Sequence, residues 1–549
     1  MKKLFLLQLL FVGVSALNAQ NTPIQLAPNT ASNDTVDNYN LPWPAWIFSH
    51  WIWEDEGTSQ SAMQLMDDYL AHDIPVGAII IDSPWETGYN TFVYDTSLYP
   101  NTQAIVNYFH SKNVKVQMWI TGVVNNDVQP LYDSIAALNY FIKHNASGGP
   151  AIVQWWKGDG SLIDWYNPDA VTWWKGLMDN ALDLGIDGWK CDGTDYYALL
   201  SNYSPGAGGT VSRLDYSHHY YQLFHDYTRE RLGPKRVNTS RPIDNYAQFD
   251  LGGDFVAFTP REIGWACWVG DQDATFGGMK DALNNMFWSD EYGYLGFGSD
   301  IGGYREDDAF PSTGRSKELF IRWAQLGALS PLMENGGGGE HRPWMYDEET
   351  TNIYRRFAKF HTSLIPYLMG ESQSYFNNGN SLMHFFNKND YSFMLGPDIF
   401  VAPILSEGGT LTVNFPTGNN WVYLFDTTQF KTGGSSATYT FPLSEFPVYV
   451  RQGSTYTIKD PGGFTAINDP YAWLSFSLFP NPANNSITVQ SSGKKAIAKV
   501  LNSQGQLLMQ LPVDSQKFTL DISQLEAGLY TLYLQTNEGI GVKQFEVAK

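Results

Sequence analysis

Residues 185–192 read Gly185-Ile186-Asp187-Gly188-Trp189-Lys190-Cys191-Asp192, a mostly apolar run that ends on a carboxylate. The pattern predicts a short buried strand. Lys190 and Asp192 are two positions apart, so a strand directs both side chains to the same face. Because unpaired buried charge is costly, the two are either a structural ion pair or part of an active site. In a barrel of parallel strands, active-site side chains lie at the C-terminal strand ends, where Asp192 is expected.

Two further runs have the same form. Residues 265–271 are apolar and end on Asp271, and residues 293–304 carry Asp300 among glycines that let a ligand approach the backbone. Two strand-end carboxylates in one domain are what glycoside hydrolysis requires. One attacks the anomeric carbon or guides water, and the other protonates the leaving oxygen.

Composition bounds the class of protein. The 549 residues are enough for two to four domains, and 43% are hydrophobic, as in globular proteins. A net charge of −22 makes nucleic acid an unlikely partner, because phosphate would be repelled. Cys191 and Cys267 are the only cysteines, and we expect buried free thiols. The histidine spacing is poor for zinc, so we expect neither a metal nor a cofactor.

The N-terminus predicts export. Lys2 and Lys3 precede an apolar stretch over residues 4–17, which is typical of a secretory signal peptide at residues 1–20. That stretch is too short to span a membrane, and no later stretch is long and apolar enough. We therefore expect a mature protein without a transmembrane segment, beginning with a polar N-terminal segment over residues 21–42.

Alternating strand-like and helix-like segments over residues 43–368 predict an α/β fold, a (β/α)8 TIM barrel. Nine candidates compete for eight strands: residues 45–50, 77–82, 114–121, 161–166, 186–192, 236–241, 265–271, 294–300 and 328–333. Expected helices are residues 59–71, 102–111, 170–184, 220–232 and 316–324. Short strands with Gly and Pro turns then predict a β-sandwich over 369–455, a linker over 456–474 and an all-β unit over 475–549.

Several motifs follow one another in order along the chain. They are Asp164-Trp165-Tyr166-Asn167-Pro168, residues 185–195, Trp268-Val269-Gly270-Asp271-Gln272, Gly298-Ser299-Asp300-Ile301-Gly302-Gly303, and residues 322–331, 364–367, 394–403 and 446–453. This ordered set resembles glycoside hydrolase family 31 across residues 43–454. The resemblance implies a retaining α-glycosidase in which Asp192 is the nucleophile and Asp271 is the general acid/base.

The chemistry of the residues agrees with those implied roles. Lys190 would favour the charged form of Asp192, and a Trp-rich, desolvated setting would favour the protonated form of Asp271. The resemblance also implies that the sugar subsite is lined by Lys190, Arg241, Trp268 and Asp300. Asp82, at the end of another expected strand, is expected to contact sugar hydroxyls as well. Asp300 is either a sugar contact or a structural hydrogen-bonding residue.

Two departures from the family pattern bear on specificity. The spacing from Arg241 to Asp271 is longer than usual, so either a loop is inserted there or Arg261 takes the role of Arg241. Residues 334–336 read Glu-Asn-Gly where the family commonly has Arg-Asn-His, with a His that contacts the sugar. His341 is a candidate substitute. The change argues against plain glucose specificity and slightly favours α-galactoside-type substrates over α-glucosides.

The last unit resembles a C-terminal sorting domain of the type IX secretion system. The matching pieces are residues 478–483, 502–506 and 525–530. The resemblance implies the type IX machinery as a partner and a secreted or cell-surface location. The alternative is an accessory carbohydrate-binding domain.

The sequence thus predicts a secreted, retaining exo-α-glycosidase acting on an oligosaccharide or polysaccharide. One alternative is a transglycosylase that uses the same carboxylates with a sugar acceptor. Another is a catalytically silent glycan-binding protein at the cell surface, which the presence of both carboxylates disfavours. Trp51 and Trp53, after the first expected strand, are either core residues or sugar platforms.

Overall fold

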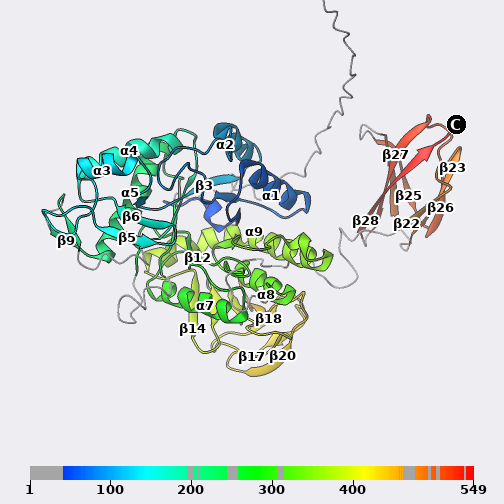
Figure 1. Ribbon diagram of the computed structural model, residues 1–549. Coiled ribbons are helices and arrows are strands. Elements are labelled where there is room, and N and C mark those ends of the chain that lie inside the picture. The colour runs from blue at the N-terminus through cyan, green and yellow to red at the C-terminus, as the bar shows by residue number, and fades with distance from the viewer. Residues whose placement is uncertain are drawn as a thin grey trace, which may run out of the picture.

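The computed structural model describes residues 41–193, 202–206, 209–243, 257–306, 314–456, 458, 460, 476–491, 496–502, 507–536 and 539–549. The expected signal peptide lies outside the described residues, as do most of the N-terminal segment and most of the linker. Figure 1 shows the helix-rich region and the C-terminal strands.

Eight parallel strands form the central barrel, in the order β12-β11-β10-β7-β3-β2-β1-β13. They are β1 (His50–Glu54), β2 (Ala78–Ile81), β3 (Lys115–Ile120), β7 (Gly188–Cys191), β10 (Thr239–Ser240), β11 (Cys267–Trp268), β12 (Phe297–Gly298) and β13 (Met333–Asn335). The two edge strands also meet. The Ile301 amide donates to the Glu334 carbonyl at 3.1 Å, and an isolated parallel bridge pairs Asp300 with Glu334. The sheet therefore closes on itself almost completely, and the expected barrel is confirmed.

The expected strands were wrong in three places, one of which is the candidate over residues 328–333, which overlaps β13 only at Met333. Most of residues 45–50 form a 3-10 helix, η1 (Ala45–Phe48), and β1 begins only at His50. All four residues of η1 are buried, and an apolar run of that length does not distinguish a strand from a buried helical turn. The ninth candidate, residues 161–166, begins in a separate antiparallel sheet of β4 (Val123–Asn125), β6 (Gly158–Leu162) and β5 (Ile152–Trp155).

Helices surround the barrel. They are α1 (Ser59–Ala71), α2 (Thr102–Ser111), α3 (Leu131–Leu138), α4 (Pro168–Leu182), α5 (Arg213–Leu232), α7 (Phe276–Glu291), α8 (Lys317–Gly327) and α9 (Glu348–Asn377), with a short 3-10 turn η2 (Pro343–Met345) and a hairpin of β8 (Asn202–Ser204) and β9 (Gly209–Val211). Side-chain N-caps set many of the starts, such as Thr58 before α1 and Ser316 before α8. Helix α9 runs through the boundary expected at residue 368.

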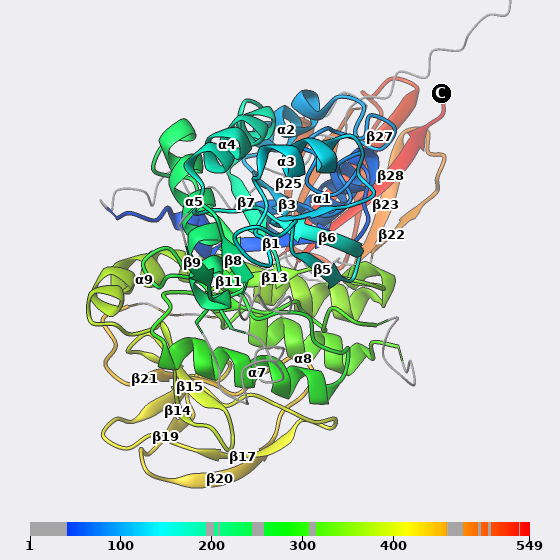
Figure 2. The same cartoon turned by 60° about the vertical axis from the view of Figure 1, so that its left-hand side comes forward.

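The second unit is built from antiparallel strands. Its main sheet has β14 (Met383–Asn387), β15 (Ser392–Leu395), β16 (Ile399–Val401), β21 (Val448–Arg451), β18 (Trp421–Tyr423) and β19 (Phe430–Lys431), and β17 (Thr410–Asn414) pairs with β20 (Ser436–Thr440). Figure 2 shows these strands against the side of α7 and α8. Arg322 of α8 is buried and donates to the carbonyls of Phe441 and Glu445 at 3.1 and 2.7 Å. One guanidinium thus ties the barrel to this unit.

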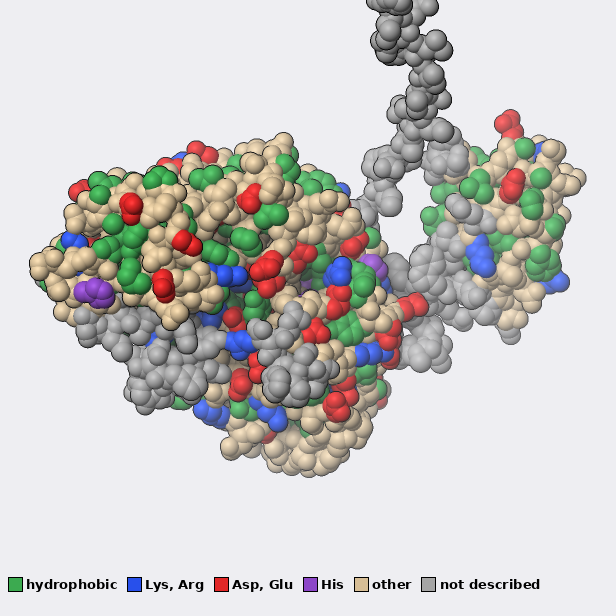
Figure 3. Space-filling model, viewed as in Figure 1, with side chains coloured by type: hydrophobic (Ala, Val, Ile, Leu, Met, Phe, Trp, Pro, Cys, Tyr) green, Lys and Arg blue, Asp and Glu red, His purple; other side chains and the backbone are tan. Residues whose placement is uncertain are grey.

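The last unit has two sheets, β22 (Phe476–Phe479), β23 (Ser486–Ser491) and β26 (Lys517–Asp521) in one, and β25 (Leu507–Val513), β24 (Ala496–Leu501), β27 (Gly528–Thr536) and β28 (Gly539–Val547) in the other. Its hydrophobic core is separate from the core that the barrel and second unit share. Figure 3 shows acidic side chains interspersed with basic ones on one face of the protein. Among the described residues, no helix has the length and apolar character needed to cross a membrane.

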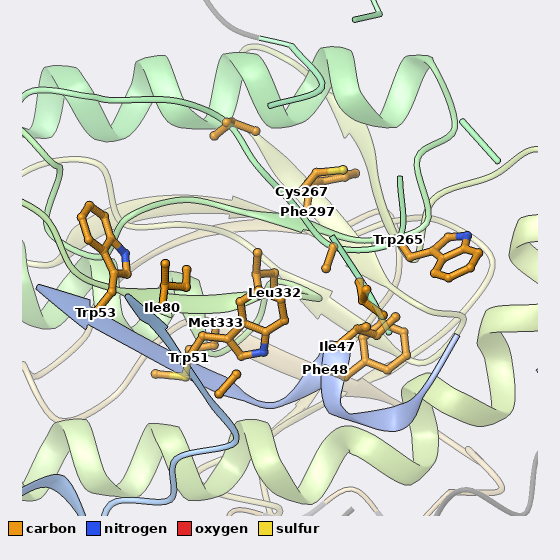
Figure 4. Close-up of a cluster of buried hydrophobic side chains, with 14 of the residues drawn as sticks. Ile47, Phe48, Trp51, Trp53, Ile80, Trp265, Cys267, Phe297, Leu332 and Met333 are labelled. Carbon is orange, nitrogen blue, oxygen red and sulfur yellow. The ribbon is translucent and has the colours of Figure 1, made fainter. Parts of the chain in front are cut away.

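The two tryptophans of β1 lie in different surroundings. Trp51 is fully buried and its indole N–H donates to the Trp46 carbonyl at 3.1 Å. Trp53 lies at one end of the buried cluster drawn in Figure 4 and lines the pocket described below. Cys191 and Cys267 are buried free thiols, as expected.

Candidate active site

A pocket of about 740 Å³ opens at the C-terminal ends of the barrel strands. Its lining residues are Trp53, Asp55, Glu56, Asp82, Ser83, Trp119, Gln154, Trp155, Trp156, Lys157, Lys190, Asp192, Arg241, Trp268, Asp271, Tyr304 and Arg305. Six of the eight site residues expected from the sequence are among them. Across the part of the chain that the structure describes, no cluster of three or more His, Cys, Asp and Glu side chains could hold a metal ion.

Asp192 follows β7 directly, and its backbone N–H donates to the Ile120 carbonyl of β3 at 2.8 Å. Each carboxylate oxygen has a donor of its own. The Trp119 indole N–H lies 3.1 Å from Oδ2, and Arg241 Nη2 lies 2.8 Å from Oδ1. Charge-assisted and geometrically fixed bonds of this kind hold a carboxylate in one orientation toward the pocket.

Asp271 lies beside Asp192 because the same nitrogen contacts both. Arg241 Nη2 is 3.1 Å from Asp271 Oδ1 as well. The two carboxylate oxygens are therefore no farther apart than the sum of these two contacts. Gly270, with φ at +88°, makes the turn after β11 that brings Asp271 to the pocket. The Asp271 side chain is 27% exposed, against 10% for Asp192, so it faces more of the solvent.

The structure resolves which arginine faces the carboxylates. Arg241 is buried at the end of β10 and its guanidinium lies 5.2 Å from the Trp268 ring centroid. Arg261 instead donates to backbone carbonyls of Gly293 and Phe376 and packs on the Phe376 ring. Arg261 does not line the pocket.

Lys190 pairs with Asp82 rather than with Asp192. Its Nζ lies 2.9 Å from Asp82 Oδ2 and 3.5 Å from the centroid of the Trp53 ring. Burial alone would lower the pKa of Lys190, but the carboxyl groups of Asp82, Glu334 and Asp300 together raise it. Lys190 is thus a permanent positive charge in the pocket floor. The direct ion pair with Asp192 comes from Arg241, and the expectation that Lys190 favours the charged form of Asp192 stays a prediction.

Two buried carboxyl groups, Asp300 and Glu334, lie near Lys190 but do not line the pocket. Burial raises the pKa of Glu334 to about 7, although Lys190 opposes the shift. Burial, followed by the neighbouring Glu334 carboxyl, also raises the pKa of Asp300. Glu334 is fully buried, and its contact with the Trp53 side chain offsets only part of the cost of burying a carboxylate. A protonated carboxyl is the cheaper form of such a group in a protein interior.

His341 is not placed to contact a ligand in the pocket. Its Nε2 lies 3.0 Å from Arg315 Nη2, and its Nδ1 lies 3.1 Å from the Ile301 carbonyl. Burial and the adjacent Arg315 lower the pKa of His341, so the ring is neutral. Sequence proximity to residue 336 suggested a substitute for the family's His, but the protein uses this ring to hold its own backbone.

Trp53 fills the space that a side chain at residue 336 would enter. A Cβ built on Gly336 would lie 2.4 Å from the Trp53 ring. The indole also stacks on Tyr304, with ring centroids 6.0 Å apart and planes 16° apart. Glycine at 336 and tryptophan at 53 are therefore complementary choices.

Sequence reasoning missed much of the pocket wall. Trp119 is near the end of an expected strand, and that position alone could have indicated a pocket residue. Trp155, Trp156 and Lys157 come from the antiparallel sheet β4-β6-β5, and a Trp-Trp pair among polar residues is their only sequence signal. Tyr304 donates to Asp55 Oδ2 at 3.0 Å, a pairing over 249 positions of the chain that no sequence pattern marks.

Gly336→Ala tests the close packing beneath the pocket. The new methyl group would press into the Trp53 ring, and overpacking of this kind typically costs about 1–3 kcal/mol. We expect the free energy of unfolding, measured by urea titration, to fall by that amount. Gly176→Ala in α4 is the matched control, because nothing lies within 4 Å of its Cβ, and a helical Gly→Ala change should stabilise by roughly 0.5–1 kcal/mol. Equal stability of the Gly336→Ala variant and the parent would contradict the packing.

Glu334→Gln tests the buried carboxyl. A group whose pKa is raised in the folded protein contributes stability at low pH that is lost as pH rises through about 7. The variant has no such loss, so its stability relative to the parent should increase by about 1–3 kcal/mol from pH 5 to pH 8. Thermal or urea unfolding at several pH values measures this difference. The exposed Glu407→Gln should show no such trend, and a flat difference for Glu334→Gln would count against the buried, protonated form.

Comparison with known proteins agrees with this geometry. Residues 41–371 match the TIM-barrel domain of glycosyl hydrolases family 31, and residues 376–455 match the C-terminal domain of the same family. Residues 477–548 match a secretion system C-terminal sorting domain, which indicates export from the cell.

Curated relatives include an α-xylosidase of Emericella nidulans, 25% identical over 76% of this chain and 54% of its own length. An isomaltosyltransferase of Sporosarcina globispora is 26% identical over 80% of this chain and 44% of its own. The chain thus spans about half the length of these relatives.

Among solved structures, a soil-metagenome family 31 α-xylosidase complexed with xylose has a TM-score of 0.63 at 22% identity, covering 75% of this chain and 64% of its own. A Flavobacterium johnsoniae dextranase complexed with glucose has a TM-score of 0.65 at 18% identity, covering 85% and 65%. The fold is shared at this level. With the family match extending over more than half of its length, the chain belongs to glycosyl hydrolase family 31.

Proposed function

We propose that the protein is an exported, retaining exo-α-glycosidase that removes terminal α-linked sugars from oligosaccharides or polysaccharides. The observation that carries the proposal is the shared contact of Arg241 Nη2 with Asp192 and Asp271, at 2.8 and 3.1 Å. The sum of these distances is below the separation of about 6.5–9.5 Å that inverting enzymes use to fit a water. It is compatible with the separation of about 5–5.5 Å between carboxyl groups in retaining enzymes.

In this mechanism Asp192 attacks the anomeric carbon and forms a covalent glycosyl-enzyme. Its orientation by Trp119 and Arg241 supports the role of nucleophile, because both donors leave the carboxylate facing the pocket. Asp271 protonates the departing oxygen and then removes a proton from the water that releases the sugar. Its greater exposure suits a group that must meet both a leaving group and water.

The sugar ring would lie over Lys190, Asp82 and Trp268, with Arg241 at its reacting side. The Lys190–Asp82 pair offers one donor group and one acceptor group to sugar hydroxyls. Asp300 would lie behind this floor, near Lys190, and would not contact the sugar. A buried polar floor with fixed partners discriminates strongly between sugars that do and do not satisfy it.

For substrate, we rank α-galactoside-type sugars slightly above α-glucosides. The support is the glycine at residue 336, where the Trp53 ring replaces a hydrogen-bonding side chain. An apolar surface selects weakly between epimers at that hydroxyl. The names of relatives, α-xylosidase and α-glucosidase among them, make pentosides and glucosides the natural competitors.

Export would proceed through the type IX secretion machinery, which recognises sorting domains of the kind matched at residues 477–548. The separate hydrophobic core of this unit supports the idea that it acts as a detachable address rather than as part of the active site.

Asp192→Asn and Asp271→Ala test the two roles. Asp192→Asn should abolish turnover while sugar binding persists. Asp271→Ala should lower kcat by roughly 10²–10⁴-fold on substrates with poor leaving groups and much less on activated aryl glycosides. Added azide should restore the second variant and give a glycosyl azide of retained configuration. The exposed surface variant Asp183→Asn is the control. Equal losses of Asp271→Ala on both substrate types would place the proton donor elsewhere.

A panel of p-nitrophenyl α-glycosides tests the sugar. The galactoside, glucoside, xyloside and N-acetylgalactosaminide share one leaving group, so kcat/KM compares the sugars alone. We expect the glucoside to be a poor substrate and the galactoside to exceed it. The highest kcat/KM on the glucoside would contradict the inference from Gly336. A wild-type protein inactive on every member, yet able to bind glycans, would favour the silent alternative.

A further inference from the structure

The antiparallel sheet β4-β6-β5 is an insertion between β3 and α4 that forms one wall of the pocket. Residues 154–157, at the end of β5 and the turn that follows, are all lining residues. Within that turn, the two neighbouring tryptophans differ in environment. Trp155 is buried at 4% exposure, whereas Trp156 is 50% exposed. A half-exposed tryptophan on a pocket wall is a typical contact surface for a ligand.

One side chain, that of Asn125, holds both sequence neighbours of Trp156. Asn125, buried on β4, accepts from the Trp155 indole at 2.6 Å and donates to the Lys157 carbonyl at 2.8 Å. The Trp155 ring also lies 4.9 Å from the Trp156 ring, with planes 58° apart. Trp156 is thus presented by a fixed turn. A rigid aromatic with only two side-chain torsions gives contact area at a low cost in conformational entropy.

Trp156 lies beside Trp119, which donates a hydrogen bond to the proposed nucleophile. Its ring centroid lies 6.5 Å from that of Trp119, whose indole N–H donates to Asp192. Beside it, Lys157 Nζ lies 3.5 Å from Glu56 Oε1, which joins the insertion to the chain that follows β1. An apolar ring face next to charged groups is the surface that a pyranose ring needs, since a sugar has C–H faces and hydroxyl edges.

We propose that Trp156 is the stacking platform for the sugar that leaves, so that the preferred substrates are oligosaccharides whose leaving group is itself a pyranose. Lys157 and Glu56 would bind the hydroxyls of that sugar. This inference rests on the proposed function, because it takes Asp192 as the point of cleavage. It deepens that function by assigning binding energy to the leaving-group side of the pocket.

The test compares two substrates that share one terminal sugar, namely the one preferred in the aryl glycoside panel. One is its α-glycosyl fluoride, whose leaving group has no ring, and the other is a disaccharide in which it is α-linked to a second pyranose. In Trp156→Ala, kcat/KM on the disaccharide should fall by up to about tenfold, the equivalent of a lost stacking contact. On the fluoride it should change by less than about twofold. Trp156→Phe, which keeps an aromatic face, should restore part of the disaccharide activity.

Phe430→Ala, which removes an exposed aromatic (60%) from β19 of the second unit, is the matched control and should change neither substrate. Thermal unfolding checks that each variant is folded. Equal losses on both substrates, or no loss on the disaccharide, would overturn the platform while leaving the glycosidase intact. A wild-type protein that cleaves neither substrate would overturn the proposed function, and this inference with it.

Discussion

The guanidinium of Arg241 lies between two carboxylates that would otherwise repel each other. Asp192 and Asp271 come from neighbouring regions of the barrel, after β7 and β11, and β10 between them supplies the arginine. Because strand order places the cation between the two anions, the closed sheet itself sets the spacing on which the proposed chemistry depends. An intervening cation reduces the electrostatic repulsion between two like charges at this distance. The tryptophans around the site restrict water and strengthen these interactions.

Charge balance extends below the pocket. Lys190 faces Asp82 directly and counteracts the raised pKa values of Asp300 and Glu334. A buried cation with several acids around it is costly to assemble and destabilising when one member is removed. The arrangement therefore restricts which residues can stand at these positions. Lys190 contacts Asp82 on one side and the Trp53 ring on the other. That ring occupies the space that a side chain at position 336 would need.

Much of the barrel could be predicted from the sequence because its signals are local. The helices over 59–71 and 102–111 were expected with the bounds they have, and the carboxylates at residues 192 and 271 follow apolar runs whose ends are visible in the sequence. What failed depends on contacts between distant segments. The turn η1 is as buried as a strand, and β4 has only three residues. Lys190 pairs with Asp82, which is 108 positions away. His341 was expected in the sugar site because it is close to residue 336 along the chain. In the structure its ring is instead hydrogen-bonded to Arg315 and to backbone carbonyls. The role of Trp156 depends on exposure, which no pattern of residue types reveals.

The buried Arg322 has a consequence for how the protein unfolds. Its guanidinium satisfies carbonyls of the second unit from a helix of the barrel, and the hydrophobic core runs without a break from one unit into the other. Separating the two units would remove the carbonyl partners of Arg322 and expose apolar surface. Neither unit is therefore stabilised by unfolding before the other. Barrel and second unit should thus unfold as one cooperative block. The sorting unit has a hydrophobic core of its own, so we expect it to unfold independently of that block.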